Sequence, residues 1–527
     1  MEPNFMDNGF EESTALSYSF GLDLGTHRSL MAVKEKHGRV EAIIPEAQEC
    51  RKGIPSLFWR TSDRDGGREL LCEEVALEDG EANDPEGVVR SVKARLAEKA
   101  IELHGVRYTP ESIAVREVQH VLELSRDAAE DMGIFQQPER LTVGVPVRFG
   151  AAERGTIRGI VEKATPGVKI QLLPEPMAAA LYYASASRTH PRRILAFDMG
   201  AGTFDTCVLV ANDQPTLEDP FPFKLLCHDG TREAGDRLDE LMEDLILSKL
   251  RRNPGSIQMR YLEDSAHHDR RALRKLARVA KEALSSAPRY TVNVSSLASG
   301  ASQAVTVTRE EYEKCIEPTI RWAVNLAVKC LESAGLRGER DMTLLLVGGS
   351  SYIPLVQRLL QQRFSWLDPK TQIVQRLPDQ SVALGCALYS ERPMAERKVA
   401  FAYAVDTFKA GTDVEVLDVR IPALCKLPYR IQSRYSTRRE NQEGIRFNIY
   451  ELEEGQAGDE FSPTQGKYTQ LAARHSFGKP VPKGTSVLLT TELSADGILT
   501  MTIDDGGISN HRSTRCAFDL ANELGRN

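Results

Sequence analysis

The order of hydrophobic and polar residues is the same in two separate stretches of the chain, at residues 20–26 and 195–205. Positions 20, 22 and 24 are hydrophobic and alternate with Gly21, Asp23 and Gly25, while positions 195, 197 and 199 alternate with residues that include Asp198 and Gly200. Side chains of a strand point alternately to its two faces. Each stretch therefore predicts a hairpin whose aspartate points away from the packed face.

Glycine and threonine follow each of these strands, as Gly25 and Thr26 in the first turn and Gly200, Gly202 and Thr203 in the second. Glycine allows close approach of the backbone, and the N–H groups of such a turn can bind phosphate oxygens together with the threonine hydroxyl. The neighbouring aspartate can hold Mg²⁺ or its waters. One copy would be equally well an ordinary tight turn. Two copies predict a duplicated domain whose hairpins face each other across a nucleotide cleft.

Other periodic patterns lie further along the chain. Residues 269–287 predict a helix, because hydrophobic residues recur at positions 273, 276, 280 and 284. From Val399 onward short alternating runs predict strands, and Asp496-Gly497 between two of them is typical of a tight hairpin turn. Taken by itself, this C-terminal region is a small all-β module with an interaction or packing role.

Composition limits the class of protein. The 527 residues exceed the roughly 250–300 that one hydrophobic core supports, so we expect several units. Hydrophobic residues make up 41% and charged residues 27%, as in ordinary globular proteins. The net charge of −8 is spread in mixed patches and provides no basic surface for nucleic acid. No secretory signal and no run of about 20 apolar residues is present, so we expect a cytoplasmic protein without a membrane partner.

The cysteines predict neither a disulfide framework nor a zinc site. They are odd in number, scattered and without a Cys-x-x-Cys pair, which favours free thiols in a reducing compartment. The nine are Cys50, Cys72, Cys207, Cys227, Cys315, Cys330, Cys386, Cys425 and Cys516.

The two loop patterns resemble the phosphate loops of the superfamily that contains actin, hexokinase and the heat-shock chaperones. Three more segments follow in the order of that superfamily: Leu173–Ala180 resembles its first connecting helix, Leu346–Pro354 its adenosine-binding turn and Pro378–Ala387 its second connecting helix. The match is closest to the DnaK-type heat shock protein 70 family. Residues 145–149 with Arg154, and residues 234–239, resemble chaperone segments that actins and sugar kinases lack.

This resemblance covers residues 18 to about 505 and implies a fold and its division. The implied fold is α/β, with duplicated actin-like (ribonuclease H-like) ATPase lobes and a C-terminal all-β sandwich domain. The expected units are an N-terminal extension at 1–17, a two-lobed nucleotide-binding domain at 18–390, a linker at 391–398, a β-sandwich that resembles a peptide-binding domain at 399–510, and a short tail at 511–527.

The same resemblance implies roles for individual residues. Asp23 and Asp198 would bind Mg²⁺ and its waters, Lys93 would orient the γ-phosphate and the attacking water, and Glu175 and Asp205 would support that water. Taken alone, Lys93 would be a solvated surface lysine, and only its register with the motif makes it catalytic. Thr203 and Asp198 complete the catalytic set. The residues expected to contact ATP or ADP are Gly25, Thr26, His27, Arg28, Gly200, Ala201, Gly202, Thr203, Gly235, Lys281, Ser285, Gly348, Gly349, Ser350, Tyr352 and Asp379.

The sequence departs from the family pattern around adenine. Glu282 stands where the family usually has an arginine packed on the base, Arg278 stands where it usually has a glutamate, and Tyr352 replaces a second arginine. A tyrosine ring can stack on a purine and partly replace the missing pair. We expect a lower affinity for ATP than the family norm.

The phosphate loops also differ from the family pattern. His27 and Arg28 replace a threonine and a second residue of the first loop, and the Arg28 cation either reaches phosphate oxygens or points to water. Ala201 replaces a glycine of the second loop, a change that the turn tolerates if its φ is negative. None of these substitutions removes a proposed Mg²⁺ ligand or catalytic group.

The expected linker and C-terminus differ from the family too. The segment Ser390–Lys398 is charged and contains a proline, in place of an acidic, leucine-rich linker, so it has little to bury in a groove of the ATPase domain. About twenty residues follow Asp505, too few for a helical lid, and we expect rapid peptide release.

Three functions fit these observations. The first is a divergent DnaK-like chaperone that binds and slowly hydrolyses MgATP and binds unfolded or extended polypeptide, with J-domain co-chaperones and nucleotide exchange factors as further partners. The second is an ATP-responsive adaptor or scaffold with one dedicated protein partner. The third is a small-molecule kinase of the same superfamily, which leaves the C-terminal strands unexplained.

Overall fold

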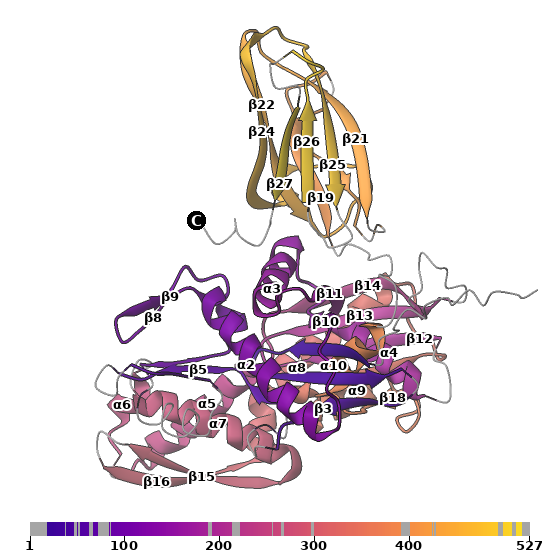
Figure 1. The fold of residues 1–527 in the computed structure, drawn as a ribbon. Helices are drawn as coiled ribbons and strands as arrows, with labels where there is room; N and C mark the ends of the chain where they lie inside the picture. The colour runs from indigo at the N-terminus through magenta and orange to yellow at the C-terminus, as the bar shows by residue number, and fades with distance from the viewer. Residues whose placement is uncertain are drawn as a thin grey trace, which may run out of the picture.

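The chain folds into a mixed α/β part followed by a C-terminal part made of strands (Figure 1). The computed structural model describes residues 18–518 apart from positions 37, 47–49, 51–52, 63–66, 72–83, 85, 188–191, 213–221, 256, 265–267, 297–299, 391–400, 410, 424, 426–427, 494–498 and 509–512. The expected N-terminal extension, the linker and the Asp496-Gly497 turn lie outside the described residues.

Two large sheets of the first part have the same strand order. In each, a hairpin supplies the first strands, and the first strand of that hairpin also pairs in parallel with a later strand. The first sheet, in the order β11-β10-β1-β2-β3, contains β1 (Tyr18–Leu24), β2 (Arg28–Glu35), β3 (Val40–Ile43), β10 (Arg140–Val145) and β11 (Lys169–Pro174), with β4 (Ile54–Pro55) beside β2. The second, in the order β14-β13-β12-β17-β18, contains β12 (Arg193–Met199), β13 (Phe204–Ala211), β14 (Phe223–Thr231), β17 (Thr343–Val347) and β18 (Ile373–Val374).

Two helices rich in small residues, α4 (Glu175–Ala186) and α10 (Ser381–Ser390), pack between these sheets. A Cβ atom on Gly385 of α10 would overlap the backbone of Ala178 in α4, and one on Gly21 of β1 would overlap the backbone of α10. The absence of side chains at these two positions lets helix and strand backbones approach directly. Strand β1 is consequently buried on both faces, not on the single face that alternation alone predicts.

The remaining helices and small sheets surround this centre. The longer helices are α2 (Pro110–Asp131), α3 (Ala151–Ala164), α5 (Gly235–Arg252), α7 (His268–Ser286), α8 (Arg309–Ser333) and α9 (Pro354–Arg363), and the short ones are α6 (Met259–Glu263), η4 (Val92–Arg95), η5 (Gly349–Tyr352) and η6 (Pro463–Gln465). The helix predicted over 269–287 forms as α7, whose hydrophobic side is buried. The small strands are β5 (Leu57–Arg60), β6 (Glu69–Leu71), β7 (Val88–Arg90), β8 (Ile101–Leu103), β9 (Val106–Tyr108), β15 (Arg289–Ser296) and β16 (Ala301–Thr308).

The C-terminal strands form two sheets that share one hydrophobic core. The first sheet contains β19 (Ala402–Phe408), β20 (Glu415–Ile421), β22 (Gln442–Leu452), β23 (Glu460–Phe461) and β24 (Lys467–Val481). The second contains β21 (Tyr429–Ser436), β25 (Ser486–Leu493), β26 (Leu499–Asp504) and β27 (Ser513–Phe518). Strand β27 pairs with β26 along its whole length, so the sheet continues beyond residue 510, where the sequence placed the start of a tail.

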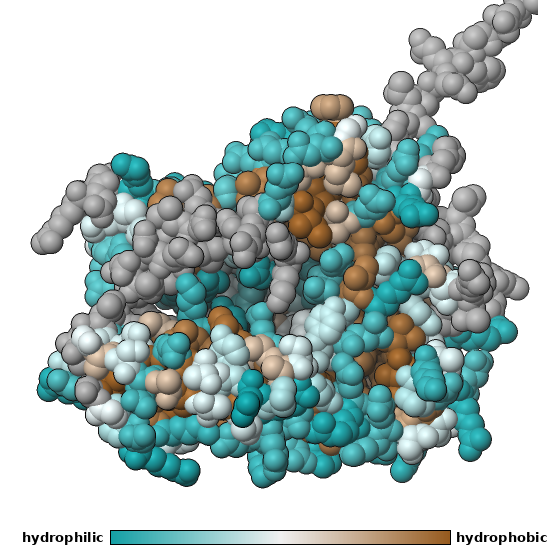
Figure 2. Space-filling view, turned by 90° about the horizontal axis from the view of Figure 1, so that it is seen from below, coloured by the Kyte–Doolittle hydropathy of each residue, from teal (hydrophilic) through white to brown (hydrophobic). Residues whose placement is uncertain are grey.

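The C-terminal sheets stand above α3 and β14 of the first part (Figure 1). Arg148 Nη2 lies 3.5 Å from Glu453 Oε1, and the rings of His228 and Phe401 pack edge to face at 6.3 Å between their centroids. On the face seen from below, hydrophobic side chains gather in several small groups among hydrophilic ones (Figure 2).

A buried carboxyl group lies in the N-terminal core. The Ser56 hydroxyl donates a hydrogen bond of 2.7 Å to Glu117 Oε2 on α2. Burial raises the pKa of Glu117 from an ordinary value of 4.5 to about 8, although the Ser56 hydrogen bond and the charge of Arg90 oppose the change. The core therefore prefers the neutral acid.

Replacing Gly385 by alanine should destabilise the whole N-terminal part. The new methyl group would meet the Ala178 backbone, which has no flexible end to move aside, so we expect a loss of about 3 kcal/mol in the free energy of unfolding. Gly159→Ala is the matched control, because a Cβ there meets open space within α3 and should stabilise the protein by about 0.5 kcal/mol. Denaturant unfolding measures both; equal effects of the two variants would contradict the close crossing of α4 and α10.

Replacing Glu117 by glutamine should remove a pH dependence of stability. The folded-state pKa lies above the ordinary value, so the contribution is complete below pH 4.5 and is lost as the pH rises towards 8. Relative to Glu117→Gln, the wild type should lose up to about 1.4 kcal/mol per pH unit across this window. Thermal unfolding at several pH values tests this, with Glu123→Gln, an exposed acid on the same helix, as a control that should show no such difference.

Candidate functional site

A cleft of about 740 Å³ opens between the two large sheets. It is lined by the loops that follow β1 and β12, the beginning of α4, one side of α7 and the segment after β17. Of the residues predicted from the sequence, all except Asp205 and Gly235 line it: Asp23, Gly25, Thr26, His27, Arg28, Lys93, Glu175, Asp198, Gly200, Ala201, Gly202, Thr203, Lys281, Ser285, Gly348, Gly349, Ser350, Tyr352 and Asp379.

The two glycine-threonine loops meet directly. A Cβ on Gly202 would lie 2.8 Å from the Thr26 hydroxyl oxygen, so only a glycine leaves room for the opposing threonine. The second loop is closed by a hydrogen bond of 3.0 Å from Gly200 N to Thr203 O. Ala201 is not among the described residues with positive φ, which meets the condition for alanine at this position. The two loops therefore lie side by side in the cleft wall.

Four carboxyl groups gather near these loops. Asp23 and Asp198 occupy equivalent places near the ends of β1 and β12, and Glu175 begins α4. Burial, together with the Glu175 carboxylate, raises the pKa of Asp23 and of Asp205 to about 7, and raises that of Asp198 as well. Carboxylates whose charges raise one another's pKa favour a bound cation, and oxygen ligands of this kind suit Mg²⁺.

Lys93 is a cation that the chain itself brings to this cluster. Its Nζ donates to the Leu24 carbonyl oxygen at 2.7 Å and lies 3.1 Å from Glu175 Oε1, and 9% of its side chain is exposed. The lysine therefore is not the solvated surface residue that its sequence context alone would suggest. It reaches the cleft from the short helix η4. Ser91, the residue before this helix, has a left-handed backbone conformation with φ of 56°.

Asp205 and Gly235 support the lining from behind. Asp205 lies opposite Asp198 across the β12–β13 hairpin, and a hydrogen bond from Thr203 acts on its carboxyl group. Gly235 begins α5 and donates from its backbone N to Gly200 O at 3.1 Å. A Cβ there would lie 2.8 Å from both this oxygen and Ser350 Oγ, so the position holds α5 against the second loop.

The opposite end of the cleft is formed by α7 and the turn after β17. Lys281 and Ser285 face Tyr352 there, and the Tyr352 hydroxyl donates to Asp379 Oδ1 at 3.2 Å. Burial and the Asp379 carboxylate raise the pKa of Tyr352 to about 12. With 41% of the residue exposed, its ring is available for stacking on a flat ligand.

Several lining residues were not predicted as site residues. Among the predicted residues, Arg28 donates a hydrogen bond of 2.8 Å from Nη1 to the carbonyl oxygen of Gly53, so its guanidinium has a backbone partner at the cleft wall. The lining residues absent from the predicted set are Arg90, Lys275, Arg278, Val279, Glu282, Ser286, Val347, Ile353, Pro378 and Val382. Arg278 and Glu282 were noticed only as departures from the family pattern, whereas Arg90 ends a short strand and carries no local signal.

Comparison with known proteins gives consistent results. A family model described as "Hsp70 protein" matches residues 78–518. The "Chaperone protein DnaK" sequences of two strains of Halobacterium salinarum, ATCC 29341 / DSM 671 / R1 and ATCC 700922 / JCM 11081 / NRC-1, are 28% identical to this chain over 507 residues. The alignments cover 94% of this chain and 74% of each relative. Among the described residues, no helix has the length and apolar character needed to cross a membrane.

Proposed function

Because this chain belongs to the Hsp70 family, we propose that it is a divergent DnaK-like molecular chaperone, which binds and slowly hydrolyses MgATP and holds unfolded or extended polypeptide in its C-terminal domain. The observation that carries the proposal is the meeting of Lys93, Glu175 and two aspartates beside a double glycine-threonine loop. The large sheets are the lobes of an actin-like nucleotide-binding domain over residues 18–390. The C-terminal sheets are a β-sandwich that begins near residue 399.

The residues of the cleft divide the work of hydrolysis. Asp23 and Asp198 would hold Mg²⁺, which when bound neutralises the phosphates. The backbone N–H groups of the two loops, with Thr26 and Thr203, bind phosphate oxygens. Lys93 contributes positive charge beside the transferred group. Glu175 supports the attacking water at the surface of the cleft, and Asp205 supports it from behind the lining. Hydrolysis of this kind depends on positioning and charge stabilisation, for which these groups suffice without a covalent nucleophile.

Exposed apolar side chains at the far tip of the C-terminal sheets are an argument for a polypeptide ligand. Phe408 at the end of β19 and Val414 before β20 are exposed by 42% and 57%. The Arg438 guanidinium lies over the Phe408 ring at 3.7 Å and forms an ion pair with Asp413. Exposed apolar side chains framed by charges are suited to extended segments that carry hydrophobic residues. Unfolded polypeptide, J-domain co-chaperones and nucleotide exchange factors are the proposed partners, in the cytoplasm.

Single-turnover hydrolysis of ATP tests the enzymatic part. We expect Lys93→Ala to bind MgATP and to hydrolyse it about 10²–10³-fold more slowly than the wild type, because a preorganised charge at the reacting group is lost. Lys99→Ala, an exposed lysine six positions further on, should hydrolyse at the wild-type rate. Binding of ATP without hydrolysis by the wild type would favour the ATP-responsive adaptor instead.

Binding of a fluorescently labelled, reduced and denatured protein tests the chaperone part. Phe408→Ala removes apolar surface at the proposed contact, and we expect about fivefold to tenfold weaker binding. Phe135→Ala is the matched control, since Phe135 is a more exposed phenylalanine in the N-terminal part. Equal affinities of the wild type and both variants, or selective binding of one folded protein only, would contradict a general chaperone.

A further inference from the structure

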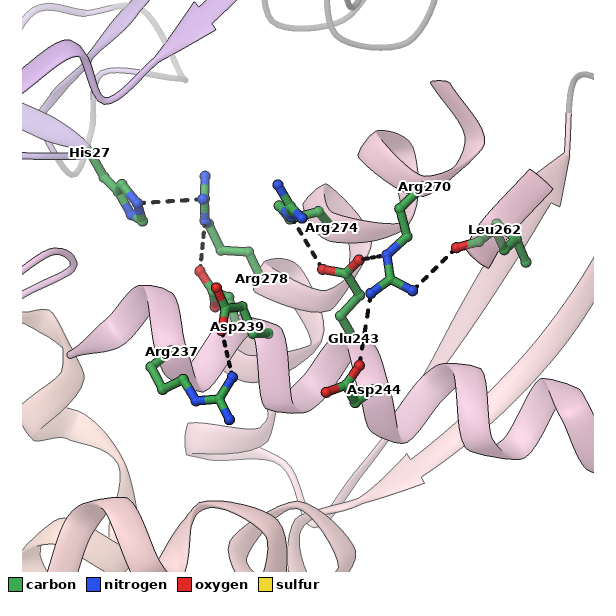
Figure 3. A network of polar contacts seen from close by, with 10 residues as sticks. His27, Arg237, Asp239, Glu243, Asp244, Leu262, Arg270, Arg274 and Arg278 are labelled. Atoms are coloured by element: carbon green, nitrogen blue, oxygen red, sulfur yellow. Dashed lines mark hydrogen bonds and ion pairs between the residues drawn. The ribbon is translucent and has the colours of Figure 1, made fainter. Parts of the chain in front are cut away.

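A side chain of the first loop contacts the other half of the N-terminal part. His27, between β1 and β2, places Nε2 at 2.6 Å from Oδ1 of Asp236, which lies in the first turn of α5. The loop belongs to the first large sheet, whereas α5 packs with the second. Figure 3 shows His27 approaching the α5–α7 pair from a separate part of the chain. This hydrogen bond therefore connects the two halves of the N-terminal part.

On the α5 side, Asp236 is held by the second phosphate loop. Its backbone N donates to Ala201 O at 2.7 Å, next to the bond between Gly235 and Gly200. Movement of Asp236 would therefore disturb the loop that is proposed to bind phosphate. His27 therefore contacts a residue whose backbone is hydrogen-bonded to the second loop, in the other half of the site.

Two cations of α7 lie beside this contact, and their charges lower the pKa of Asp236. Because Nε2 of His27 donates its proton to Asp236, it accepts no hydrogen bond from Arg278. Arg278 on α7 lies 3.4 Å from His27 Nε2 through Nη2, and its Nε lies 3.1 Å from Asp239 Oδ2 (Figure 3). Lys281 Nζ lies 2.7 Å from Asp239 Oδ1. One turn further along α5, Glu243 is paired with two other arginines of α7, which fixes the two helices to each other.

The charge states suit a hydrogen bond from histidine to carboxylate. Burial lowers the pKa of His27, and the charge of Arg278 acts in the same direction, so the imidazole is neutral near neutral pH. Burial opposes a low pKa at Asp236, but the hydrogen bond from His27 and the charges of Arg278 and Lys281 lower it. Neutral His27 therefore donates from Nε2 to a charged Asp236, a stronger bond than one between two neutral groups.

Two departures from the family pattern come together at this contact. His27 and Arg278 both differ from the residues expected in their motifs, and they are 251 positions apart in the sequence yet adjacent in the structure. His27 lines the cavity whereas Asp236 does not, so their bond joins the cavity wall to a residue behind it.

We propose that His27 and Asp236, braced by Arg278 and Asp239, form a latch that holds the two halves closed and slows the release of bound nucleotide. The proposal rests on the nucleotide site proposed above. Opening of the cleft requires this hydrogen bond to break, so its loss lowers the barrier to release. Both partners of the latch are side chains of the protein, so the hydrogen bond does not include an atom of the ligand.

Displacement of N-methylanthraniloyl-ADP in a stopped-flow instrument tests the latch in the full-length chain. His27→Ala and Asp236→Ala should each release the nucleotide about tenfold faster, the change that one hydrogen bond to a charged group produces. The double variant should be no faster than the faster single variant, because both substitutions remove one interaction. His27→Gln keeps a donor near the position of Nε2 and should stay close to the wild-type rate. Arg237→Ala is the control, since Arg237 is exposed and pairs with Glu240.

Two results would overturn the latch. Asp236→Ala with the wild-type release rate would mean that the bond between His27 and Asp236 does not hold the halves closed, and additive effects in the double variant would mean that the two residues act separately. Hydrogen exchange of the nucleotide-free protein gives a readout that needs no ligand: His27→Ala should speed exchange in residues 233–240, and Asp236→Ala in residues 25–30. Faster exchange without any nucleotide binding by the wild type would keep the latch and reject the proposed function.

Discussion

The close crossing of α4 and α10 is the constraint on which the cleft depends. The crossing brings Gly385 onto the backbone of Ala178 and seats α10 on β1 at Gly21. The two large sheets are therefore held at a fixed separation by helix backbones rather than by flexible side chains. The aspartates at the ends of β1 and β12 both lie near the first residue of α4, because the Glu175 carboxylate raises the pKa of Asp23 and of Asp198. The chemistry of the site follows from a packing contact that contains no reactive group.

That packing has an electrostatic consequence. Burying four carboxyl groups near one lysine is unfavourable, and the raised pKa values of Asp23, Asp198 and Asp205 express this cost. A divalent cation at the same place would remove most of the repulsion, because it supplies the charge that Lys93 alone cannot. Charged phosphates would in turn be repelled by these acids without a metal between them. The arrangement thus fits a ligand that arrives as a metal complex.

The sequence predicts the local parts of this site better than its assembly. Strand, glycine turn and aspartate are close in the chain, so alternation and turn chemistry locate both phosphate loops without any knowledge of tertiary structure. The burial of Lys93, the second face of β1 and the place of Arg90 depend on contacts between distant segments, for which the local pattern contains no signal. Residues 511–527 were expected to form a short tail, whereas β27 within them is positioned by pairing with the partner strand β26. The departures at His27 and Arg278 were visible in the sequence, but their contact was not.

These departures have a common logic in the proposed nucleotide site. The proposed Mg²⁺ ligands and catalytic groups are kept, whereas the changes fall at the adenosine end and at His27, Arg28 and Ala201 in the two loops. Loss of the arginine pair around the base removes stacking energy that would hold the nucleotide, and a bond between His27 and Asp236 supplies closing energy from the protein instead. Retention of the nucleotide would then depend on contacts with its phosphates and on closure of the cleft more than on contacts with its base. In a cleft of this kind, one set of residues determines how long the closed state lasts and another determines how tightly the base is bound.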